Sequence, residues 1–320
     1  MLYETIDIDN EPITGTLLYN VNNSFLYYNV YLDLINDYYQ NIVKIIKNIL
    51  HKNKELRVNI TLCNNYNFNN NNKTLIIKIN YEHTLVRSGD SGILKDTPFG
   101  NINYDSVEKY LVRIVDYEDL NNSDIIIDYS NANIYNVESC SKYDSFSRKH
   151  IYISSSIYKP YFIKENRNII TLTTFININN PRRLKLLKNI CDEKIKHTNI
   201  NNCFKENVMQ YILKNTKILI NIHQTPYHHT LEELRVLPAL ECGVIVISEK
   251  SPLIEIIPYS NLIIWTSYDD IIEKTKEVIN NYDSFHDKIF STENIYTIYN
   301  LKKRNYHVLQ NMILEKSSFV

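Results

Sequence analysis

The stretch ILINIHQTPYHHTLEELRVLPALECGVIVISEKS, residues 218–251, decides the fold because its apolar and polar segments alternate in a recognisable order. Short apolar runs at both ends are typical of buried parallel strands, and residues 231–242 between them have the apolar spacing of a helix. Thr230 followed by Glu233 matches a capping box, which predicts a helix start near Thr230. Gly243 is expected to end this helix in the left-handed conformation. Strand, helix, strand predicts a parallel sheet with a right-handed crossover.

The rest of the chain repeats this alternation on both sides of the central stretch. We therefore predict an α/β protein with two Rossmann-like domains, residues 1–158 and 159–320, joined by a linker within residues 154–168. Whether the last helix of the chain belongs to the second domain or packs back on the first is left open. The expected strands are residues 57–63, 74–79, 110–114, 124–128, 150–154, 168–175, 217–222, 244–248 and 262–265, and the expected helices are 38–50, 181–190, 231–242 and 269–280.

The composition excludes several common classes of protein. The 320 residues include only 5 glycines, none in the pattern of a dinucleotide fingerprint, a P-loop or a nucleophile elbow. The 35 basic and 36 acidic residues give a formal net charge of -1, which provides no general attraction to nucleic acid or to anionic membranes. We therefore expect no nucleic acid as a partner, with a local basic groove left open.

Cysteine usage and the hydropathy pattern lead us to expect a cytoplasmic protein. The 5 cysteines are widely spaced, so neither a disulfide framework nor a zinc ribbon is expected. The acidic N-terminal segment is no signal peptide, and no apolar run approaches the ~20 residues that cross a bilayer. Histidines 223, 228 and 229 with Cys242 lack a known coordination spacing, so no metal site is expected.

Ligands of open α/β sheets bind beyond the carboxyl ends of the strands, which directs attention to the loops that follow them. In the second domain, His223 follows a strand, and the next helix begins with free N–H groups and a partial positive charge suited to a diphosphate. In the first domain, a polar loop over residues 81–92 follows a strand. Its Glu82, His83 and Asp90 are candidates for a general base, although an ordinary polar loop is an equally good interpretation of each.

The segment Arg235-Val-x-x-Ala239-Leu240-x-Cys242-Gly243, followed by an apolar strand, resembles the donor-binding half of GT-B glycosyltransferases of the family-1-like group. The resemblance covers about a tenth of the chain and implies two Rossmann-like domains facing a cleft. It also implies a nucleotide-diphospho-sugar held by the second domain, with Arg235 facing the diphosphate. Candidate donor-binding residues are His223, Thr230, Glu232, Glu233, Arg235, Glu241, Ser248 and Glu249.

One position departs from the family pattern. Members usually carry a ribose-binding Glu five residues before the glycine, and here that position is Pro238. Ribose recognition is therefore expected to move to Glu241 or Glu249. Glu233 and Glu241 have the E-x7-E spacing of the retaining branch, but they are three residues out of register with Gly243, and we attribute the spacing to coincidence.

The sequence predicts a metal-independent glycosyltransferase that moves a sugar from a nucleotide-diphospho-sugar to a hydroxyl of a glycan, a protein or a small molecule. No bound cofactor is expected apart from the donor substrate. The alternative is a non-catalytic two-domain α/β protein derived from a glycosyltransferase, which the proline at position 238 favours. Glu232 and Glu233 also have a plainer interpretation as partners of the helix dipole.

Overall fold

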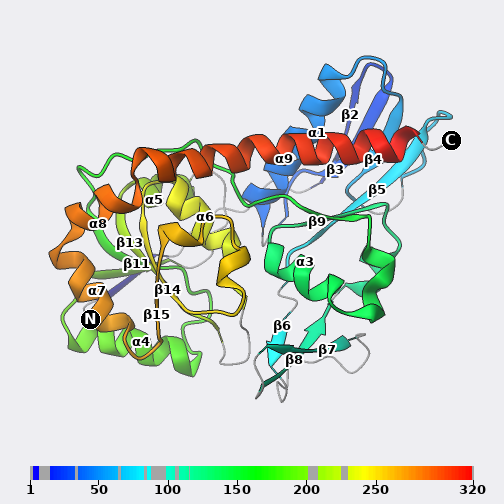
Figure 1. Cartoon of the computed structure of the whole chain (residues 1–320). Helices are drawn as coiled ribbons and strands as arrows, with labels where there is room; N and C mark the ends of the chain where they lie inside the picture. Colours follow the sequence, from blue (N-terminus) through cyan, green and yellow to red (C-terminus); the bar gives the residue numbers. More distant parts are fainter. Residues whose placement is uncertain are drawn as a thin grey trace. The chain divides into compact units, whose positions relative to one another are not determined.

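The structure is a computed structural model that describes residues 3–6, 15–32, 35–63, 66–82, 85–87, 99–104, 108–114, 116–200, 208–224 and 230–318. The chain forms two compact units, coloured along the sequence in Figure 1. Unit 1 comprises Met1–Asn10 and Ser155–Asn300, and unit 2 comprises Glu11–Ser154 and Leu301–Val320. The predicted boundary lay at residue 158 and assigned the first ten residues to the other domain.

Unit 1 is built on a six-stranded sheet in which all pairings are parallel, in the order β1-β12-β11-β13-β14-β15. The middle strand β13 is apolar on both faces, and Ile218, Leu219 and Ile220 are fully buried. This is the pattern of a parallel strand covered on both sides. The strands are β1 (Tyr3–Ile6), β11 (Ile169–Thr173), β12 (His197–Ile200), β13 (Thr216–Asn221), β14 (Ile245–Glu249) and β15 (Ile263–Thr266).

The order of these strands identifies the ligand-binding edge of unit 1. From β11 the chain moves outward to β12, then returns to the other side of β11 to form β13, β14 and β15. The strand order therefore reverses between β11 and β13, as in doubly wound folds that bind ligands beyond the carboxyl ends at the reversal. The strands are connected by α4 (Pro181–Asp192), α5 (Val208–Lys214) and α6 (Glu233–Glu241), and by η2 (Ile254–Ile256) and η3 (Ser260–Leu262) before β15. α7 (Ile271–Asn280) and α8 (Tyr282–Ile289) follow β15.

A buried arginine ties three segments of unit 1 together. Arg167 is 4% exposed, and its guanidinium donates to the carbonyl oxygens of Leu213, Thr216 and Cys242 at 3.1, 2.6 and 2.7 Å. Its Nε donates to Ile163 O at 2.8 Å. The guanidinium thus satisfies carbonyl groups near the end of α5, the start of β13 and the end of α6, and we expect its loss to be costly.

Unit 2 has a six-stranded sheet in the order β10-β9-β5-β4-β3-β2, and β2 is its antiparallel edge strand. The other five strands are parallel and follow one another in sequence order across the sheet. The strands are β2 (Thr16–Val21), β3 (Ser24–Asn29), β4 (Val58–Thr61), β5 (Lys73–Asn80), β9 (Ile125–Asp128) and β10 (His150–Tyr152). The helices are α1 (Asn36–Lys52), α2 (Tyr117–Asn121), α3 (Asn131–Glu138) and η1 (Ser141–Phe146), and the division between the units falls within α9 (Thr292–Ser318).

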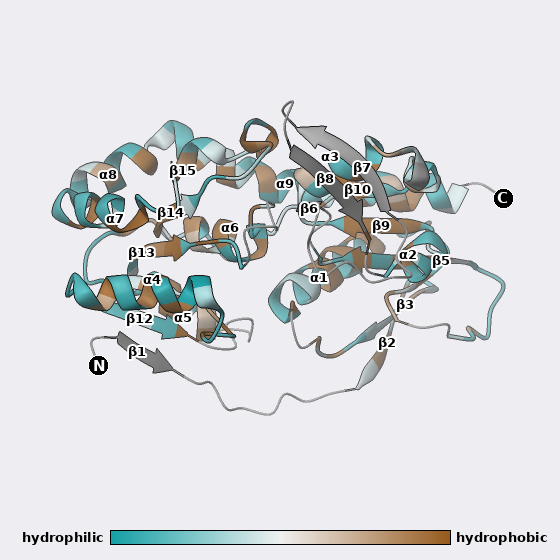
Figure 2. Cartoon of the chain, turned by 90° about the horizontal axis from the view of Figure 1, so that it is seen from below, coloured by the Kyte–Doolittle hydropathy of each residue, from teal (hydrophilic) through white to brown (hydrophobic). Residues whose placement is uncertain are grey.

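The hydropathy pattern agrees with the layered architecture of each unit. Figure 2 shows β9 and β13 predominantly apolar, whereas α4 alternates between polar and apolar residues. Leu186, Leu187 and Ile190 are the apolar residues that α4 buries, and Lys185 and Lys188 are exposed. Two predominantly parallel sheets combined with helices confirm the predicted α/β class.

Three local predictions have clear outcomes. Residues 110–114 were expected to form a parallel strand, which is wrong: β8 (Glu108–Arg113) pairs antiparallel with β6 (Leu85–Arg87) and β7 (Phe99–Tyr104). The capping box is also wrong, because α6 begins at Glu233, and Glu232 rather than Thr230 is the residue before it. The prediction for Gly243 is confirmed by its φ of +69° directly after α6 and its C-cap Cys242.

Candidate functional site

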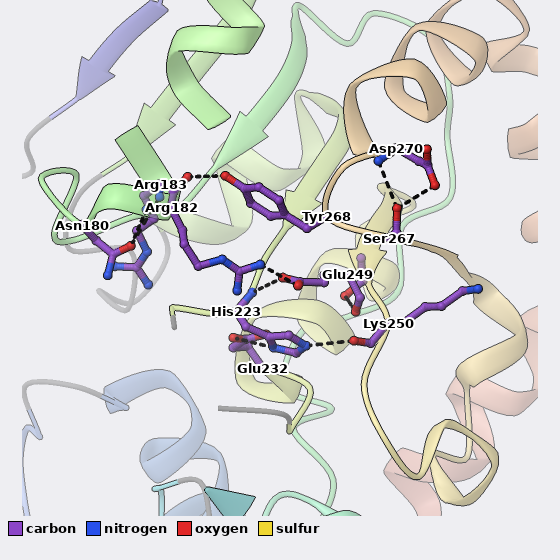
Figure 3. Close-up of polar contacts among 11 residues, drawn as sticks. Asn180, Arg182, Arg183, His223, Glu232, Glu249, Lys250, Ser267, Tyr268 and Asp270 are labelled. Atoms are coloured by element: carbon purple, nitrogen blue, oxygen red, sulfur yellow. Dashed lines mark hydrogen bonds and ion pairs between the residues drawn. The ribbon is translucent and has the colours of Figure 1, made fainter. Parts of the chain in front are cut away.

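A connected set of polar side chains lies at the carboxyl edge of the unit 1 sheet, and we call it the switch-point network. Its residues are Arg182, Asn221, His223, Glu232, Arg235, Ser248, Glu249 and Tyr268. They come from the ends of β13 and β14, the first turns of α4 and α6 and the turn after β15. Figure 3 shows several of them converging.

The pairing register of β13 and β14 places two residues of the network opposite each other. Asn221 at the end of β13 lies opposite Ser248 on β14, and both are fully buried. The Asn221 amide donates to Ser248 Oγ at 3.0 Å and to Glu232 Oε2 at 2.8 Å. Its carbonyl oxygen accepts from Arg235 Nη1 at 2.9 Å. One buried amide therefore fixes a carboxylate and a guanidinium from the first turn of α6.

His223 lies two residues further on and is 1% exposed. Its Nδ1 is 3.5 Å from Glu232 Oε1, and its backbone N–H donates to Glu249 Oε2 at 3.1 Å. Nε2 lies 3.2 Å from Lys250 O, an acceptor that requires a proton on this nitrogen (Figure 3). Burial alone lowers the pKa of His223, but the attraction of Glu232 and Glu249 outweighs it, and the pKa is raised. The imidazolium form is therefore favoured between two carboxylates.

Arg182 extends the network to α4. Its Nη2 donates to Glu249 Oε1 at 2.6 Å, and its guanidinium lies 4.3 Å from the centre of the Tyr268 ring. The Tyr268 hydroxyl donates to Arg182 O at 2.7 Å (Figure 3). Asn180 caps α4 by accepting from the N–H groups of Arg182 and Arg183, so the helix start holds this arginine in place. A carboxylate and an aromatic face together orient one guanidinium.

Two guanidinium nitrogens of the network have hydrogen-bonding capacity left. Arg182 Nη1 and Arg235 Nε are buried and have no hydrogen-bond partner among the described residues. A buried donor that stays unsatisfied costs about 1–3 kcal/mol, so such donors point to a ligand or water. Arg182 and Arg235 thus have N–H groups left to donate, and guanidinium donors of this kind suit anionic oxygen atoms of a ligand.

The predicted donor-binding residues divide between this network and the core. The switch-point network contains five of them, which are His223, Glu232, Arg235, Ser248 and Glu249. Thr230 is 2% exposed and its hydroxyl has no hydrogen-bond partner among the described residues. Arg182 and Asn221 were not predicted as site residues, although the sequence Asn180-Pro181 after a strand is a helix-start signal that could have indicated Arg182.

Glu233 and Glu241 are fully buried and have structural partners. Glu233 Oε2 accepts from the Tyr259 hydroxyl at 2.7 Å. The Glu241 carboxylate accepts from Ser156 Oγ at 2.5 Å and from the backbone N–H groups of Ile157 and Tyr158 at 2.9 and 2.7 Å. The contacts of Glu241 hold the segment that was predicted to be a linker, and both carboxylates have partners within the core of unit 1.

The general-base candidates lie in unit 2. Glu82 follows β5, and its backbone oxygen accepts from the side-chain amides of Asn80 and Asn133 at 3.3 and 3.2 Å. Both amides also donate to the fully buried Asp128, at 2.6 and 3.1 Å. The position of Glu82 is thus fixed by a buried polar network. His83 and Asp90 lie outside the described residues.

The described residues contain neither a candidate metal cluster nor a helix that could cross a membrane. Within these ranges no three His, Cys, Asp or Glu side chains converge to hold a metal ion. In the same part of the chain, no helix combines the length and apolar character that crossing a membrane requires.

Comparison with known proteins gives one relative in sequence. No family model matches the chain. Uncharacterized protein R358 of Acanthamoeba polyphaga mimivirus is 30% identical over 175 residues, which make up 53% of this chain and 59% of that protein. The chain thus aligns with less than two thirds of this relative.

Two crystal structures resemble the chain weakly. That of TarM has a TM-score of 0.47 and 11% identity and covers 87% of this chain and 58% of that chain. That of an α1,3-fucosyltransferase with GDP has a TM-score of 0.41 and 10% identity and covers 84% of this chain and 87% of that chain. Neither likeness assigns an activity to this chain.

Proposed function

We propose that the protein is a glycosyltransferase that uses a nucleotide-diphospho-sugar, with its donor site at the switch-point network. The observation that carries this proposal is the pair of guanidinium groups, Arg182 and Arg235, which flank the chain Glu249–His223–Glu232 and keep unused N–H donors. The place of this pair, beyond the carboxyl ends of parallel strands where the strand order reverses, agrees with nucleotide binding. The family resemblance at Arg235 points the same way.

The chemistry required of each group follows from its charge. Arg182 and Arg235 would neutralise the negative charge that develops on the departing nucleoside diphosphate, which is the role that a divalent ion has in other transferases. Carboxylates accept two hydrogen bonds from neighbouring hydroxyls, so Glu232 and Glu249 suit a ribose or a sugar. These two carboxylates are 13% and 14% exposed, in contrast to the buried Glu233 and Glu241. The acceptor base would come from Glu82, His83 or Asp90.

The competing function is a nucleotide-binding protein without catalysis. Pro238 favours it, because this residue is buried within α6 at the position where the resembled family carries its ribose-binding Glu. A proline side chain offers no hydrogen bond to a ribose. The two functions differ in turnover, not in binding.

The test measures binding and turnover on the full chain. Uridine, guanosine, adenosine and cytidine diphosphates and their common sugar conjugates would be screened by thermal shift, since a ligand at 100 times its Kd adds about 2.7 kcal/mol of stability. Release of the nucleoside diphosphate from a stabilising donor, with water as acceptor, would then be followed over hours. Stabilisation with release supports the transferase, and stabilisation without release supports the non-catalytic protein. Absence of stabilisation by every nucleotide overturns the donor site itself.

A further inference from the structure

The hairpin of β2 and β3 forms one edge of the unit 2 sheet, and β2 is the last strand of that sheet among the described residues. The two strands pair without interruption from Thr16 opposite Asn29 to Val21 opposite Ser24, so this pairing contains no bulge. Residues 15–30 include no charged side chain and no proline. Proteins commonly use charges, prolines or bulges to keep other chains from an edge strand. β2 has none of these protections, which suits a strand that pairs with another chain.

Alternation along the hairpin determines which backbone groups of β2 point outward. The N–H of Val30 donates to the carbonyl oxygen of Gly15 at 2.8 Å, so Gly15 directs its carbonyl group toward β3. In an antiparallel pair, residues that bond to the partner strand alternate with residues whose backbone groups point away from it. The N–H and C=O groups of Thr16, Leu18 and Asn20 therefore point to the outer edge of the sheet.

The centre of β2 carries exposed apolar side chains. Leu17 is 50% exposed and Leu18 is 44% exposed, and as neighbours in a strand they lie on opposite faces of the sheet. Leu18 lies opposite Tyr27, whose ring stacks on that of Tyr66 with 4.3 Å between the ring centres. Tyr66 is itself 38% exposed. An apolar row thus begins at Leu18 and continues inward over β3.

Helix α1 covers the opposite face of the hairpin and contributes a lysine there. The Lys47 ammonium lies 5.1 and 4.4 Å from the ring centres of Tyr19 and Tyr28, and Nζ donates to the Tyr28 hydroxyl at 2.7 Å. This ammonium is therefore held against two rings of the hairpin. The position of α1 over β2 and β3 also decides whether a second sheet has room beside the first.

A second copy of β2 fits the edge in an antiparallel register centred on Leu18. In that register Leu18 lies opposite its own copy and Thr16 lies opposite Asn20 of the second copy, so the outward backbone groups bond to one another. Leu17 lies opposite Tyr19 of the second copy, an aliphatic–aromatic pair of the kind that stabilises sheets. Because residues 15–30 carry no charge, this pairing brings no like charges together along the strand, and a charged peptide would gain no ion pair there.

We propose that the β2 edge of unit 2 is a homodimer interface, at which two copies of the chain join their sheets around Leu18. The two α1 helices would lie about 10–14 Å apart, two to three strand spacings, which is no closer than packed helices lie. Each copy contributes one strand to this small interface, so we expect a Kd of about 1–100 μM. The inference uses unit 2 alone and does not rest on the proposed function.

Sedimentation velocity of the full chain, from about 1 to about 200 μM, tests the proposal and should show a monomer–dimer equilibrium. Leu18→Lys should weaken the dimer by about tenfold or more, because it places two ammonium groups opposite each other at the centre of the interface. Leu184→Lys is the matched control, since Leu184 is 50% exposed on α4 of unit 1. This control should leave the Kd of the dimer unchanged.

Cysteine cross-linking tests the register. In Leu18→Cys the two introduced residues have a Cα separation of about 5.5 Å, which a disulfide spans, so mild oxidation should link the copies. In Leu17→Cys the introduced residues are diagonal neighbours about 7–8 Å apart, beyond the usual reach of a disulfide, and should not link. The parent chain, oxidised in parallel, gives the background from its native cysteines.

Three results would overturn the proposal. The first is a chain that stays monomeric up to about 200 μM, above the expected range of Kd. The second is a dimer with the same Kd in Leu18→Lys as in Leu184→Lys. The third is equal cross-linking in Leu17→Cys and Leu18→Cys. Both leucines of β2 are exposed, so their variants are expected to fold, and thermal unfolding checks this.

Discussion

Arg182 Nη2 lies 2.6 Å from Glu249 Oε1, although the two residues are 67 positions apart in the chain. This contact joins the first turn of α4 to the end of β14, on either side of the point where the strand order reverses. Tyr268, from a third segment, packs on the same guanidinium. The geometry of the proposed donor site therefore depends on this contact.

The first prediction concerns Arg182. In Arg182→Met we expect the affinity for the stabilising nucleotide to fall by about ten- to a hundredfold, because one charged hydrogen bond contributes roughly 1.5–3 kcal/mol. Calorimetry at a temperature where both proteins are folded measures the change. Lys188→Met on the exposed face of the same helix should leave the affinity unchanged. Equal losses in the two variants would contradict a specific role for Arg182.

The second prediction is a pH dependence that comes from His223. Burial opposes protonation, but Glu232 and Glu249 raise the pKa of this imidazole above its unfolded value. Its protonation therefore stabilises the fold below the unfolded pKa of about 6.5, and this stabilisation is lost as the pH rises through the raised folded pKa. In Glu232→Gln the loss should be smaller, so the stability difference from the parent should shrink as the pH rises. Urea unfolding from about pH 6 to about pH 9 measures it, and a difference that does not vary with pH would contradict the assignment.

The third prediction separates Glu241 from the donor site. Its buried carboxylate accepts from Ser156, Ile157 and Tyr158, so Glu241→Ala should lower the free energy of unfolding by about 3 kcal/mol or more. Nucleotide affinity, measured on the fraction that remains folded, should stay within about twofold of the parent. An intact stability with a large loss of affinity would instead return Glu241 to the site.

The fourth prediction concerns Gly243. A Cβ built at this position would lie 2.7 Å from Tyr161 O, 2.8 Å from Arg167 Nη2 and 2.9 Å from Phe162 Cα, and the backbone has a φ of +69°. Gly243→Ala should therefore cost about 3 kcal/mol or more, since overpacking adds to the left-handed strain. Gly15→Ala is the comparison, because its φ of +144° is also unfavourable but nothing lies within 4 Å of its Cβ. Thermal unfolding should show a clearly smaller loss for Gly15→Ala, and equal losses would rule out the steric contribution.

The fifth prediction concerns Arg167, which donates to four backbone carbonyls. Arg167→Met leaves these carbonyls without their donor, and we expect a loss of about 3–5 kcal/mol in the free energy of unfolding. Arg167→Lys should recover only part of it, because an ammonium lacks the planar fork of the guanidinium. If Arg167→Lys recovered the whole free energy of unfolding, the positive charge alone would account for the contribution of Arg167 to stability.

Local periodicity explains how much of the fold could be predicted from the sequence. Apolar runs such as residues 217–222 and the left-handed position of Gly243 depend on neighbours in the chain, and both were predicted correctly. Strand orientation depends on partners far away, so the apolar run before Ile114 could not reveal that β8 is antiparallel. The capping box failed because the Glu233 N–H donates to Leu231 O at 2.8 Å, a local turn that replaces the expected cap.

The same distinction applies to the candidate site. His223, Glu232, Arg235 and Glu249 lie in one stretch of 27 residues, so a single motif could indicate them together. Arg182 and Tyr268 reach the network only through the sheet order, which no local pattern contains. The buried partners of Glu241 could not be predicted for a related reason, because Ser156 and Tyr158 lie more than eighty positions earlier in the chain.

The edge strand β1 has a consequence for the biosynthesis of unit 1. Tyr3 pairs with His197, a separation of 194 positions, so residues near the start of the chain complete a sheet whose other strands are made much later. At about 5–20 residues per second, the ribosome would need roughly 10–40 s to produce the partner strand. During that interval β1 has no native neighbour, while residues 11–154, the larger segment of unit 2, are made. Closure of the unit 1 sheet is then a late step of maturation.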